Sequence, residues 1–360
     1  MSRRLKVGVV GGGVGAAHID ALLELPDLYE VRAFCDVDEA LGRTVCAANA
    51  IPSAVVSYDA LLDLDLDLID LATPPHLHFS QALKALQAGH HVVVEKPLAG
   101  SLAEVDALAA AEADGTARLA PMFQYRFGNG LRRFLHLRNK GLVGRPLIAT
   151  VATHWLRGPD YYAKPWRGRW GTELGGCLVG HAIHAHDLLT QAMGPVARVF
   201  ARVATRVNPI ETDDCAAVVL ELASGAVATS SVTLGAQEEI SQIKLCFDGL
   251  TVESGLDPYN PGYEPWRFVC ADPERQRAVD AAFADFVPGP QRFTGYFAAL
   301  HAALTTGAPL PVSVADARGA LELVTALYTS ARTGTSVTLP LGKDAMLYDG
   351  WAPGAAEAGR

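Results

Sequence analysis

Short apolar runs alternate with helical patterns through the first third of this 360-residue chain. This alternation constrains the fold more than any other feature, because strands that alternate with helices form a parallel sheet covered on both faces. The apolar runs are Lys6–Val10, Val31–Cys35, Leu68–Ala72 and Val92–Val94. Helical spacing fills the segments between them, and a Ser101–Glu104 capping box predicts a helix ending near Asp114. We expect residues 1–122 to form a doubly wound α/β domain.

The rest of the chain has a different pattern, in which strands follow one another without intervening helices. Such an order favours a mainly antiparallel sheet. We expect residues 123–360 to form a second, α+β domain. Its predicted strands are Leu147–Trp155, Val196–Thr205, Cys215–Leu222, Val227–Leu234 and Ile240–Phe247, and its predicted helices cover roughly 130–140, 293–304 and 315–329.

Composition excludes several classes of protein. Half of the residues are apolar and the formal net charge is −9, which disfavours disorder, nucleic-acid binding and binding to anionic membranes. The longest apolar runs are far shorter than a membrane span, and the N-terminus lacks a signal-peptide pattern. Six cysteines without a CxxC pair indicate reduced thiols. We therefore expect a globular, cytoplasmic protein.

A glycine-rich turn joins the first predicted strand to the first predicted helix. Gly11, Gly13 and Ala16 satisfy GxGxxG/A, which lets the backbone of residues such as Val14 and Gly15 approach a pyrophosphate at a helix N-terminus. Asp36, at the end of the second strand, is placed to accept hydrogen bonds from a ribose and to repel a 2′-phosphate, which favours NAD over NADP. The alternatives are a turn without a ligand and a helix-capping role for Asp36. The neighbouring Asp38 is predicted to cap a helix.

At this point the sequence resembles the Gfo/Idh/MocA family, the glucose–fructose oxidoreductases, inositol dehydrogenases and their relatives. The resemblance rests on ordered motifs over nearly the whole chain. These motifs are Thr73-Pro74-Pro75-His76-Leu77-His78, Ala88-Gly89 through Glu95-Lys96-Pro97, Tyr161-Tyr162, Trp166-Arg167-Gly168, Trp170, and Gly175-Gly176 through His184 to Asp187.

The resemblance implies an N-terminal Rossmann domain and a C-terminal domain with an open, mainly antiparallel sheet that often mediates homodimers or homotetramers. It implies NAD(P)-linked oxidation or reduction at a carbinol carbon of a sugar, a polyol or a sugar-derived acid. The cofactor-binding residues that it implies, beside the glycine turn and Asp36, are Thr73, Pro74, Pro75, His78, Glu95 and Lys96. As helix N-terminal residues, His76 and His78 have capping as an alternative role.

Two positions depart from the family pattern. The glycine turn is one residue shorter before His18 than the usual GxGxxGxxH spacing, which leaves the role of His18 open. The family's catalytic Asp falls on Gly180, so the expected carboxylate is missing, and His181 follows it.

Lys96 and His184 are the predicted proton-handling residues. A lysine at the carboxyl end of a strand can stabilise an alkoxide, and an imidazole titrates near neutral pH. The alternative for Lys96 is a surface lysine paired with Glu95.

His181 either replaces the missing carboxylate, as an orienting group or a second proton relay, or is an ordinary helix-face residue. His181, His184 and Asp187 are spaced to share a broad helix face, whereas His186 points elsewhere. The same cluster contains possible metal ligands, but it has no HExxH pattern, and we expect no metal.

Aromatic residues beside an arginine suit a sugar or an acidic group, and anchoring of a loop is the alternative. The predicted substrate residues are Tyr125, Trp166, Arg167, His181 and Asp187.

The family resemblance implies three candidate functions. The first is a dehydrogenase or reductase for carbohydrate-like substrates. The second is an enzyme that retains NAD and catalyses a net non-redox reaction, as some glycosidase relatives do. The third is a regulatory protein that binds the nucleotide without turnover.

Overall fold

A computed structural model describes residues 3–353 of the chain. The chain divides into two compact units, unit 1 with residues 1–123 and 293–319, and unit 2 with residues 124–292 and 320–360. The placement of residues 293–319 differs from the predicted continuous division at 122/123. Its local cause is the packing of Phe293 and Phe297 against His18 and Tyr29 inside unit 1.

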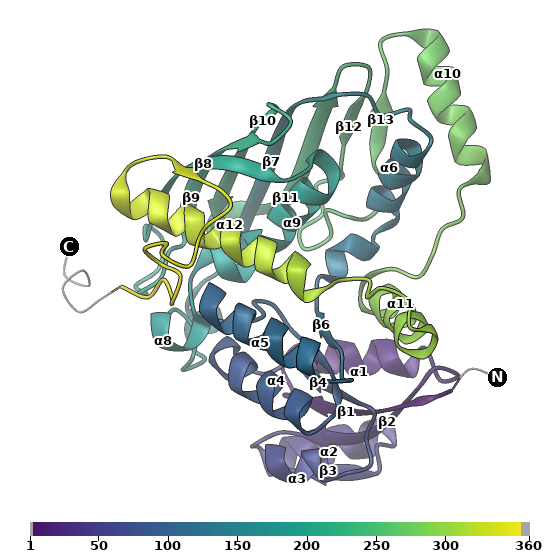
Figure 1. Ribbon diagram of the computed structural model, residues 1–360, viewed down its shortest axis with the longest axis vertical. Helices are drawn as coiled ribbons and strands as arrows, with labels where there is room; N and C mark the ends of the chain where they lie inside the picture. Colours follow the sequence, from purple (N-terminus) through teal and green to yellow (C-terminus); the bar gives the residue numbers. More distant parts are fainter. Residues whose placement is uncertain (1–2, 354–360) are drawn as a thin grey trace. The chain divides into compact units, whose positions relative to one another are not determined.

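Unit 1 contains a six-stranded parallel sheet in the order β3-β2-β1-β4-β5-β6 (Figure 1). Its central strands are short apolar runs buried on both faces, as expected of a covered parallel sheet. The order reverses between β1 and β4, the position at which open α/β sheets bind ligands. The strands are β1 (Leu5–Val10), β2 (Tyr29–Cys35), β3 (Ser53–Val55), β4 (Leu68–Leu71), β5 (His91–Val94) and β6 (Leu119–Pro121).

Two helices of unit 1, α2 and α5, begin where their sequences predict caps. The Asp38 carboxylate accepts hydrogen bonds from Ala40 and Leu41, and the Ser101 hydroxyl accepts one from the Glu104 amide, which confirms both predicted caps. Helices α4 and α5 pack side by side. The helices are α1 (Gly15–Leu23), α2 (Glu39–Asn49), α3 (Tyr58–Leu62), the short η1 (Pro75–Leu77), α4 (His78–Gln87), α5 (Leu102–Asp114) and α11 (Arg292–Thr306).

Unit 2 contains an eight-stranded sheet in the order β13-β12-β11-β7-β10-β9-β8-β14. All neighbouring strands are antiparallel except β7 and β10, which confirms the predicted mainly antiparallel sheet. The strands are β7 (Pro146–Leu156), β8 (Val196–Ala204), β9 (Cys215–Leu222), β10 (Val227–Thr233), β11 (Gly235–Phe247), β12 (Thr251–Glu253), β13 (Arg267–Val269) and β14 (Val337–Thr338).

Burial alternates along β9 and β10, so one face of this sheet is covered and the other is exposed. Helix α9 packs against β7 and β11 on the covered face (Figure 1). The helices of unit 2 are η2 (Gln124–Phe127), α6 (Asn129–Asn139), α7 (Pro159–Tyr162), α8 (Trp170–Glu173), η3 (Leu178–Ala182), α9 (Ile183–Met193), α10 (Pro273–Ala282) and η4 (Phe283–Asp285). Helix α12 (Val314–Thr333) begins with the last residues of unit 1 and continues into unit 2.

Candidate functional site

The glycine turn between β1 and α1 leaves backbone open to a ligand. Gly11 has a φ of +96°, and a Cβ there would lie 2.7 Å from the Ala72 carbonyl oxygen. A Cβ on Gly13 would meet nothing within 4 Å, so the backbone is accessible there. Gly15 lies close to the segment that follows β4, because a Cβ on Gly15 would lie 3.2 Å from that of Ala72. The turn therefore combines close approaches at Gly11 and Gly15 with open backbone at Gly13.

Asp36 is anchored at both carboxylate oxygens. Oδ2 accepts the Gly12 amide at 2.7 Å, and Oδ1 accepts the Asp38 amide at 3.0 Å. Each oxygen keeps a lone pair for a further donor. The carboxylate thus faces the glycine turn, while helix capping is left to Asp38.

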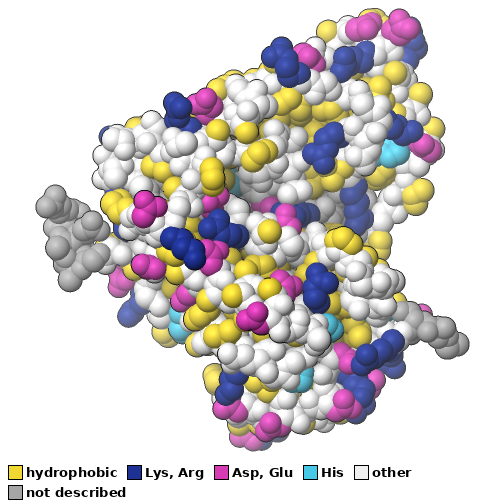
Figure 2. Space-filling view, viewed as in Figure 1, with side chains coloured by type: hydrophobic (Ala, Val, Ile, Leu, Met, Phe, Trp, Pro, Cys, Tyr) yellow, Lys and Arg dark blue, Asp and Glu magenta, His cyan; other side chains and the backbone are white. Residues whose placement is uncertain are grey.

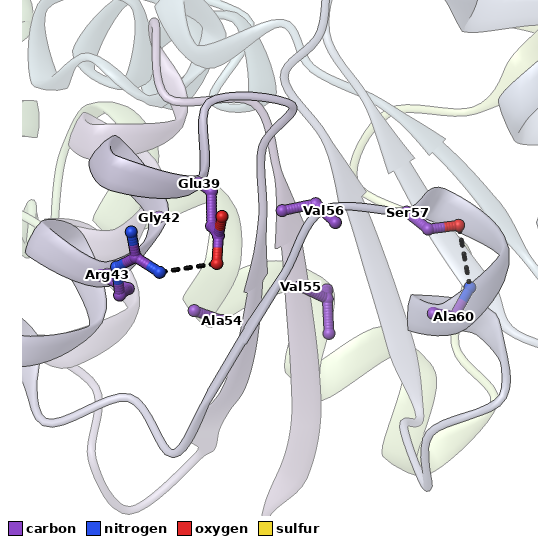
Figure 3. A pocket seen from close by; sticks show the side chains of 8 residues that line it. All are labelled: Glu39, Gly42, Arg43, Ala54, Val55, Val56, Ser57 and Ala60. Atoms are coloured by element: carbon purple, nitrogen blue, oxygen red, sulfur yellow. Dashed lines mark hydrogen bonds and ion pairs between the residues drawn. The ribbon is translucent and has the colours of Figure 1, made fainter.

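A pocket of about 450 Å³ lies beyond Asp36 along the chain (Figure 3). It is formed by one side of α2 and by the segment that joins β3 to α3. The Glu39–Arg43 pair borders it on α2, and Ser57 caps α3 on the opposite side. None of the predicted site residues lines this pocket, whose lining is Glu39, Gly42, Arg43, Ala54, Val55, Val56, Ser57 and Ala60.

The segments after β4 and β5 are joined by the buried side chain of His78. Its Nδ1 lies 2.7 Å from the Pro97 carbonyl oxygen and its Nε2 lies 2.8 Å from that of Thr73. Burial lowers the pKa of His78, although both carbonyl contacts favour the charged form. His78 therefore connects the segment after β4, at Thr73, to the segment after β5, at Pro97. Lys96, the residue before Pro97, is half-buried.

Behind Lys96, three ionisable side chains meet in the interior of unit 1. His18 Nδ1 lies 2.9 Å from an oxygen of Asp70, and His18 Nε2 lies 3.3 Å from Glu95 Oε1. His18 and Asp70 are fully buried and Glu95 is 5% exposed. Burial by itself lowers the pKa of His18, but Asp70 and then Glu95 outweigh it and raise the pKa to about 10.

In unit 2, the predicted histidines lie on a helix whose first turn is π-helical. Gly180 and His181 belong to η3, and α9 carries His184 and Asp187. The ring of His184 stacks on Tyr125, with centroids 4.4 Å apart. Asp187 accepts two hydrogen bonds from Arg126, at 2.6 and 2.8 Å, in a buried bidentate pair.

His181 ends a chain of polar contacts that leads to a buried carboxylate. Its Nε2 lies 3.3 Å from the Tyr161 hydroxyl, which also accepts a hydrogen bond from Arg167. Arg167 pairs with Glu173 at 2.8 Å, and its guanidinium stacks on the Trp166 ring. A Cβ on Gly180 would find Glu173 Oε1 at 4.0 Å, so a carboxylate from α8 lies near the glycine. Burial raises the pKa of Tyr161 to about 12, which keeps its hydroxyl protonated.

Two further side chains hold this helix in place. His186 Nε2 lies 2.9 Å from the Ser230 hydroxyl, and burial lowers the pKa of His186 to about 4, so this histidine is neutral at physiological pH. The buried Asp213 carboxylate accepts hydrogen bonds from the amides of Gly176 and Leu178, at the start of the helix. Asp213 therefore fixes the point at which η3 begins.

The sequence did not predict which side chains the candidate site residues contact. Those contacts are Asp70 with His18, Arg126 with Asp187, and Glu173 with Arg167. The role of Asp213 at the start of η3 was not predicted either. Nor did the sequence predict the pair of Arg157 and Glu239 at 2.9 Å, in which Arg157 stacks on Trp155 and Tyr161. Each pair joins residues from different elements, apart from the local pair of Arg167 and Glu173. An acidic residue inside the apolar run Leu68–Ala72 was the one available signal for Asp70.

Within residues 3–353, no helix has the length and apolar character that a membrane crossing requires. The same residues form no group of three or more His, Cys, Asp or Glu side chains suited to a metal ion. Basic and acidic side chains are interspersed over the face drawn in Figure 2.

Comparison with known proteins identifies two family profiles along the chain. Residues 5–123 match the oxidoreductase family with an NAD-binding Rossmann fold, and residues 131–249 match the GFO/IDH/MocA C-terminal domain. The WlbA dehydrogenase from Bordetella pertussis, in complex with NADH and UDP-GlcNAcA, is 29% identical with a TM-score of 0.83. That similarity covers 94% of this chain and all of the other.

Curated relatives are distant. Inositol 2-dehydrogenase from Arthrobacter sp. is 29% identical over 82% of this chain and 91% of its own length. An uncharacterized oxidoreductase from Synechocystis sp. is 26% identical over 64% of this chain and 66% of its own length. A glycosyl hydrolase family 109 protein from Streptomyces niveus is 33% identical over 48% of this chain and 38% of its own length. Together, the two matching profiles and the two sheets show that this chain belongs to the Gfo/Idh/MocA family of oxidoreductases.

Proposed function

We propose that this protein is an NAD-dependent dehydrogenase or reductase. It transfers a hydride between nicotinamide and a carbinol carbon of a sugar, a polyol or a sugar-derived acid. The observation that carries this proposal is the glycine turn, with an accessible backbone at Gly13 and with the Asp36 carboxylate bound to the Gly12 amide. The NADH complex of the WlbA dehydrogenase supports it.

The residues present fit a dinucleotide. Helix α1 begins without a side-chain cap, which leaves its N-terminal amides to a ligand such as a pyrophosphate. Asp36 keeps lone pairs for ribose hydroxyls, and its negative charge disfavours a 2′-phosphate, so NAD is preferred over NADP. Thr73, Pro74 and Pro75, at the carboxyl end of β4, border the same turn through Ala72. When bound, NAD supplies the hydride acceptor.

The protein's own task is to position the substrate and move one proton. Lys96 would hydrogen-bond the substrate oxygen and stabilise developing negative charge on it. His184, oriented by its stacking on Tyr125, would exchange the hydroxyl proton. His181, connected through Tyr161 and Arg167 to Glu173, would orient the substrate where Gly180 offers no side chain.

A carbohydrate-like substrate suits the side chains around His181. Trp166, Tyr161 and Arg167 combine aromatic faces with a guanidinium, which matches apolar sugar faces and hydroxyl or carboxylate groups. The relatives act on or bind such compounds by name: inositol for one, UDP-GlcNAcA for another. We assign this substrate class without choosing one sugar.

Fluorescence titration with NADH and NADPH tests the proposal, followed by a screen of NAD⁺ with polyols, sugars and sugar acids at 340 nm. We expect tight NADH binding, at least tenfold weaker NADPH binding (about 1.4 kcal/mol), and turnover with one substrate class. Binding of neither nucleotide, by protein shown by mass spectrometry to carry none, would contradict the cofactor assignment.

The similarity to glycosyl hydrolase family 109 supports a second candidate, a non-redox reaction that uses a retained NAD. This enzyme would keep its nucleotide through purification and release product with no net change in absorbance at 340 nm. The same screen, read by product analysis, separates the two functions.

We also propose that a second copy of the chain covers the exposed face of the unit 2 sheet. Four apolar side chains on adjacent strands are 37–51% exposed there: Ile148, Phe200, Val219 and Val227. An apolar area of this kind on a sheet face supports a homodimer or homotetramer. The six cysteines are free thiols, which supports a reducing, cytoplasmic environment.

A further inference from the structure

The His18 ring lies between two carboxylates in the interior of unit 1. Asp70 comes from the middle of β4, and Glu95 directly follows β5. The ring is also enclosed by Phe293 at 4.6 Å and Phe297 at 5.7 Å, so water is excluded from it. A charged cluster in such a place is costly unless its members satisfy one another.

When both carboxylates are ionised, the geometry requires both ring nitrogens to donate. Ionised carboxylates are acceptors only, and a neutral imidazole has a single N–H group. A neutral ring would therefore leave either Asp70 or Glu95 without its hydrogen bond. The pKa of His18, raised to about 10, agrees with a doubly protonated ring at neutral pH.

Glu95 connects the His18 ring to the backbone of the next residue, Lys96. Its Oε1 faces His18, and its Oε2 accepts the backbone amide of Lys96 at 3.0 Å. With both oxygens engaged, the carboxylate has one orientation. The hydrogen bond from the Lys96 amide to this carboxylate therefore holds the backbone of Lys96 in place after the carboxyl end of β5, and with it the start of the Lys96 side chain.

We infer that His18 is a positioning residue for Lys96, acting through Glu95, with Asp70 keeping the His18 ring able to donate at both nitrogens. This inference rests on the proposed function only for the role of Lys96. The His18–Glu95–Lys96 linkage itself is independent of substrate.

Other titratable groups surround this linkage. Tyr29 on β2 and Tyr296 on α11 are buried, and their pKa values are raised, first by burial and then by Asp70. Their hydroxyls donate to the carbonyl oxygens of Phe297 and Ala120 and stay protonated. His78 lies within the electrostatic influence of both Glu95 and Lys96.

Asp70→Asn tests the linkage two contacts away from Lys96. Without the Asp70 charge, burial dominates and the His18 ring becomes neutral as the pH rises, so it no longer donates to Glu95. We expect the ratio of variant to wild-type kcat to approach one only below the new, lowered pKa of His18 and to fall by about tenfold per pH unit above it. The KM for NAD should change by less than about threefold. Asp67→Asn, at a partly buried carboxylate that directly precedes β4 and pairs with Arg3, is the matched control and should give a flat ratio.

Backbone hydrogen exchange provides a readout without substrate. The Lys96 amide should exchange about tenfold faster in Asp70→Asn than in the wild type or Asp67→Asn at pH 8.5. If the wild type binds no nucleotide but this difference is present, the proposed function fails and the linkage stands. If the wild type turns over and both the pH ratio and the exchange rate are unchanged, the linkage is overturned and the proposed function stands.

The wild-type protein gives an answer even if Asp70→Asn does not fold. Among its eleven histidines, nitrogen NMR of the side chains should show a doubly protonated ring that persists at pH 8.5. Absence of any such ring would overturn the inference.

Discussion

Backbone groups hold the proposed nucleotide-binding residues of unit 1, whereas side chains hold the histidine helix of unit 2. The glycine turn offers accessible backbone, and Asp36 is fixed by two backbone amides. In contrast, His181, His184 and Asp187 each depend on another side chain: Tyr161, Tyr125 and Arg126. The comparison teaches that substitutions near the turn should alter which nucleotide binds, while substitutions along the helix should alter turnover.

Lys96 is the exception to this division, since it belongs to unit 1 but is proposed to hydrogen-bond the substrate oxygen during hydride transfer. Lys96→Met should lower kcat by about 10²–10⁴-fold, the usual contribution of a group that handles a proton. The dissociation constant for NADH, measured by fluorescence, should stay within about threefold of the wild type. A variant that keeps most of its turnover would place Lys96 among the binding residues only.

His181→Ala should give the next largest loss, about 10–100-fold in kcat, because it removes the end of the chain that leads to Glu173. Tyr161→Phe, which keeps the ring but deletes the hydroxyl, is the conservative companion and should give a smaller loss. Steady-state kinetics at saturating NAD measures both. Wild-type turnover in His181→Ala would show that this histidine is an ordinary residue of the helix face.

Asp36→Asn should change the preference between NADH and NADPH rather than kcat. Loss of the negative charge removes the repulsion of a 2′-phosphate, so the ratio of NADPH to NADH affinity should rise by about tenfold. Asp38→Asn, which alters only the cap of α2, is the control. An unchanged ratio in Asp36→Asn would mean that Asp36 serves the turn through Gly12 and not the ribose.

The contrast between the two regions also explains what the sequence could predict. The caps at Asp38 and Ser101 act on neighbours along the chain, so local spacing predicted them. Gly11 and Asp36 are predicted from a motif of fixed spacing, although the hydrogen bond between Asp36 and the Gly12 amide joins residues 24 apart. Asp70 and His18 are 52 residues apart, and Arg126 and Asp187 are 61 apart, so no local pattern pairs them. The π-helical turn at His181 is set by tertiary contacts such as Asp213, and helical spacing could not foresee it.

The pH dependence of the free energy of unfolding tests the buried cluster of His18, Asp70 and Glu95 in unit 1. The folded-state pKa of His18, about 10, lies above its ordinary value of 6.5, so protonation stabilises the fold. This stabilisation is fully present below pH 6.5 and is lost as the pH rises through about 10. The free energy of unfolding in urea should fall by a few kcal/mol over that window. His18→Gln should lack this fall, whereas His154→Gln, on the sheet of unit 2, should retain it.

The sheet of unit 2 carries the smallest expected effect on activity. Val219 lies opposite Phe200 on β8 and Thr229 on β10 and is 51% exposed, so an arginine there would place a charge in the middle of the proposed contact between copies. Val219→Arg should lower the mass measured by light scattering to that of one chain or one dimer. Turnover should stay within about twofold, because surface changes away from a site cost little.

Val287→Arg, at an exposed apolar residue outside the sheet, should leave the mass unchanged. A wild-type monomer, or a Val219→Arg protein of unaltered mass, would show that copies of the chain do not meet on this face. If Val219→Arg instead lowered turnover as strongly as His181→Ala, the division between regions would fail. The histidine helix packs on the covered side of the same sheet, and such a loss would mean that assembly holds this helix in place as much as Tyr125 and Arg126 do.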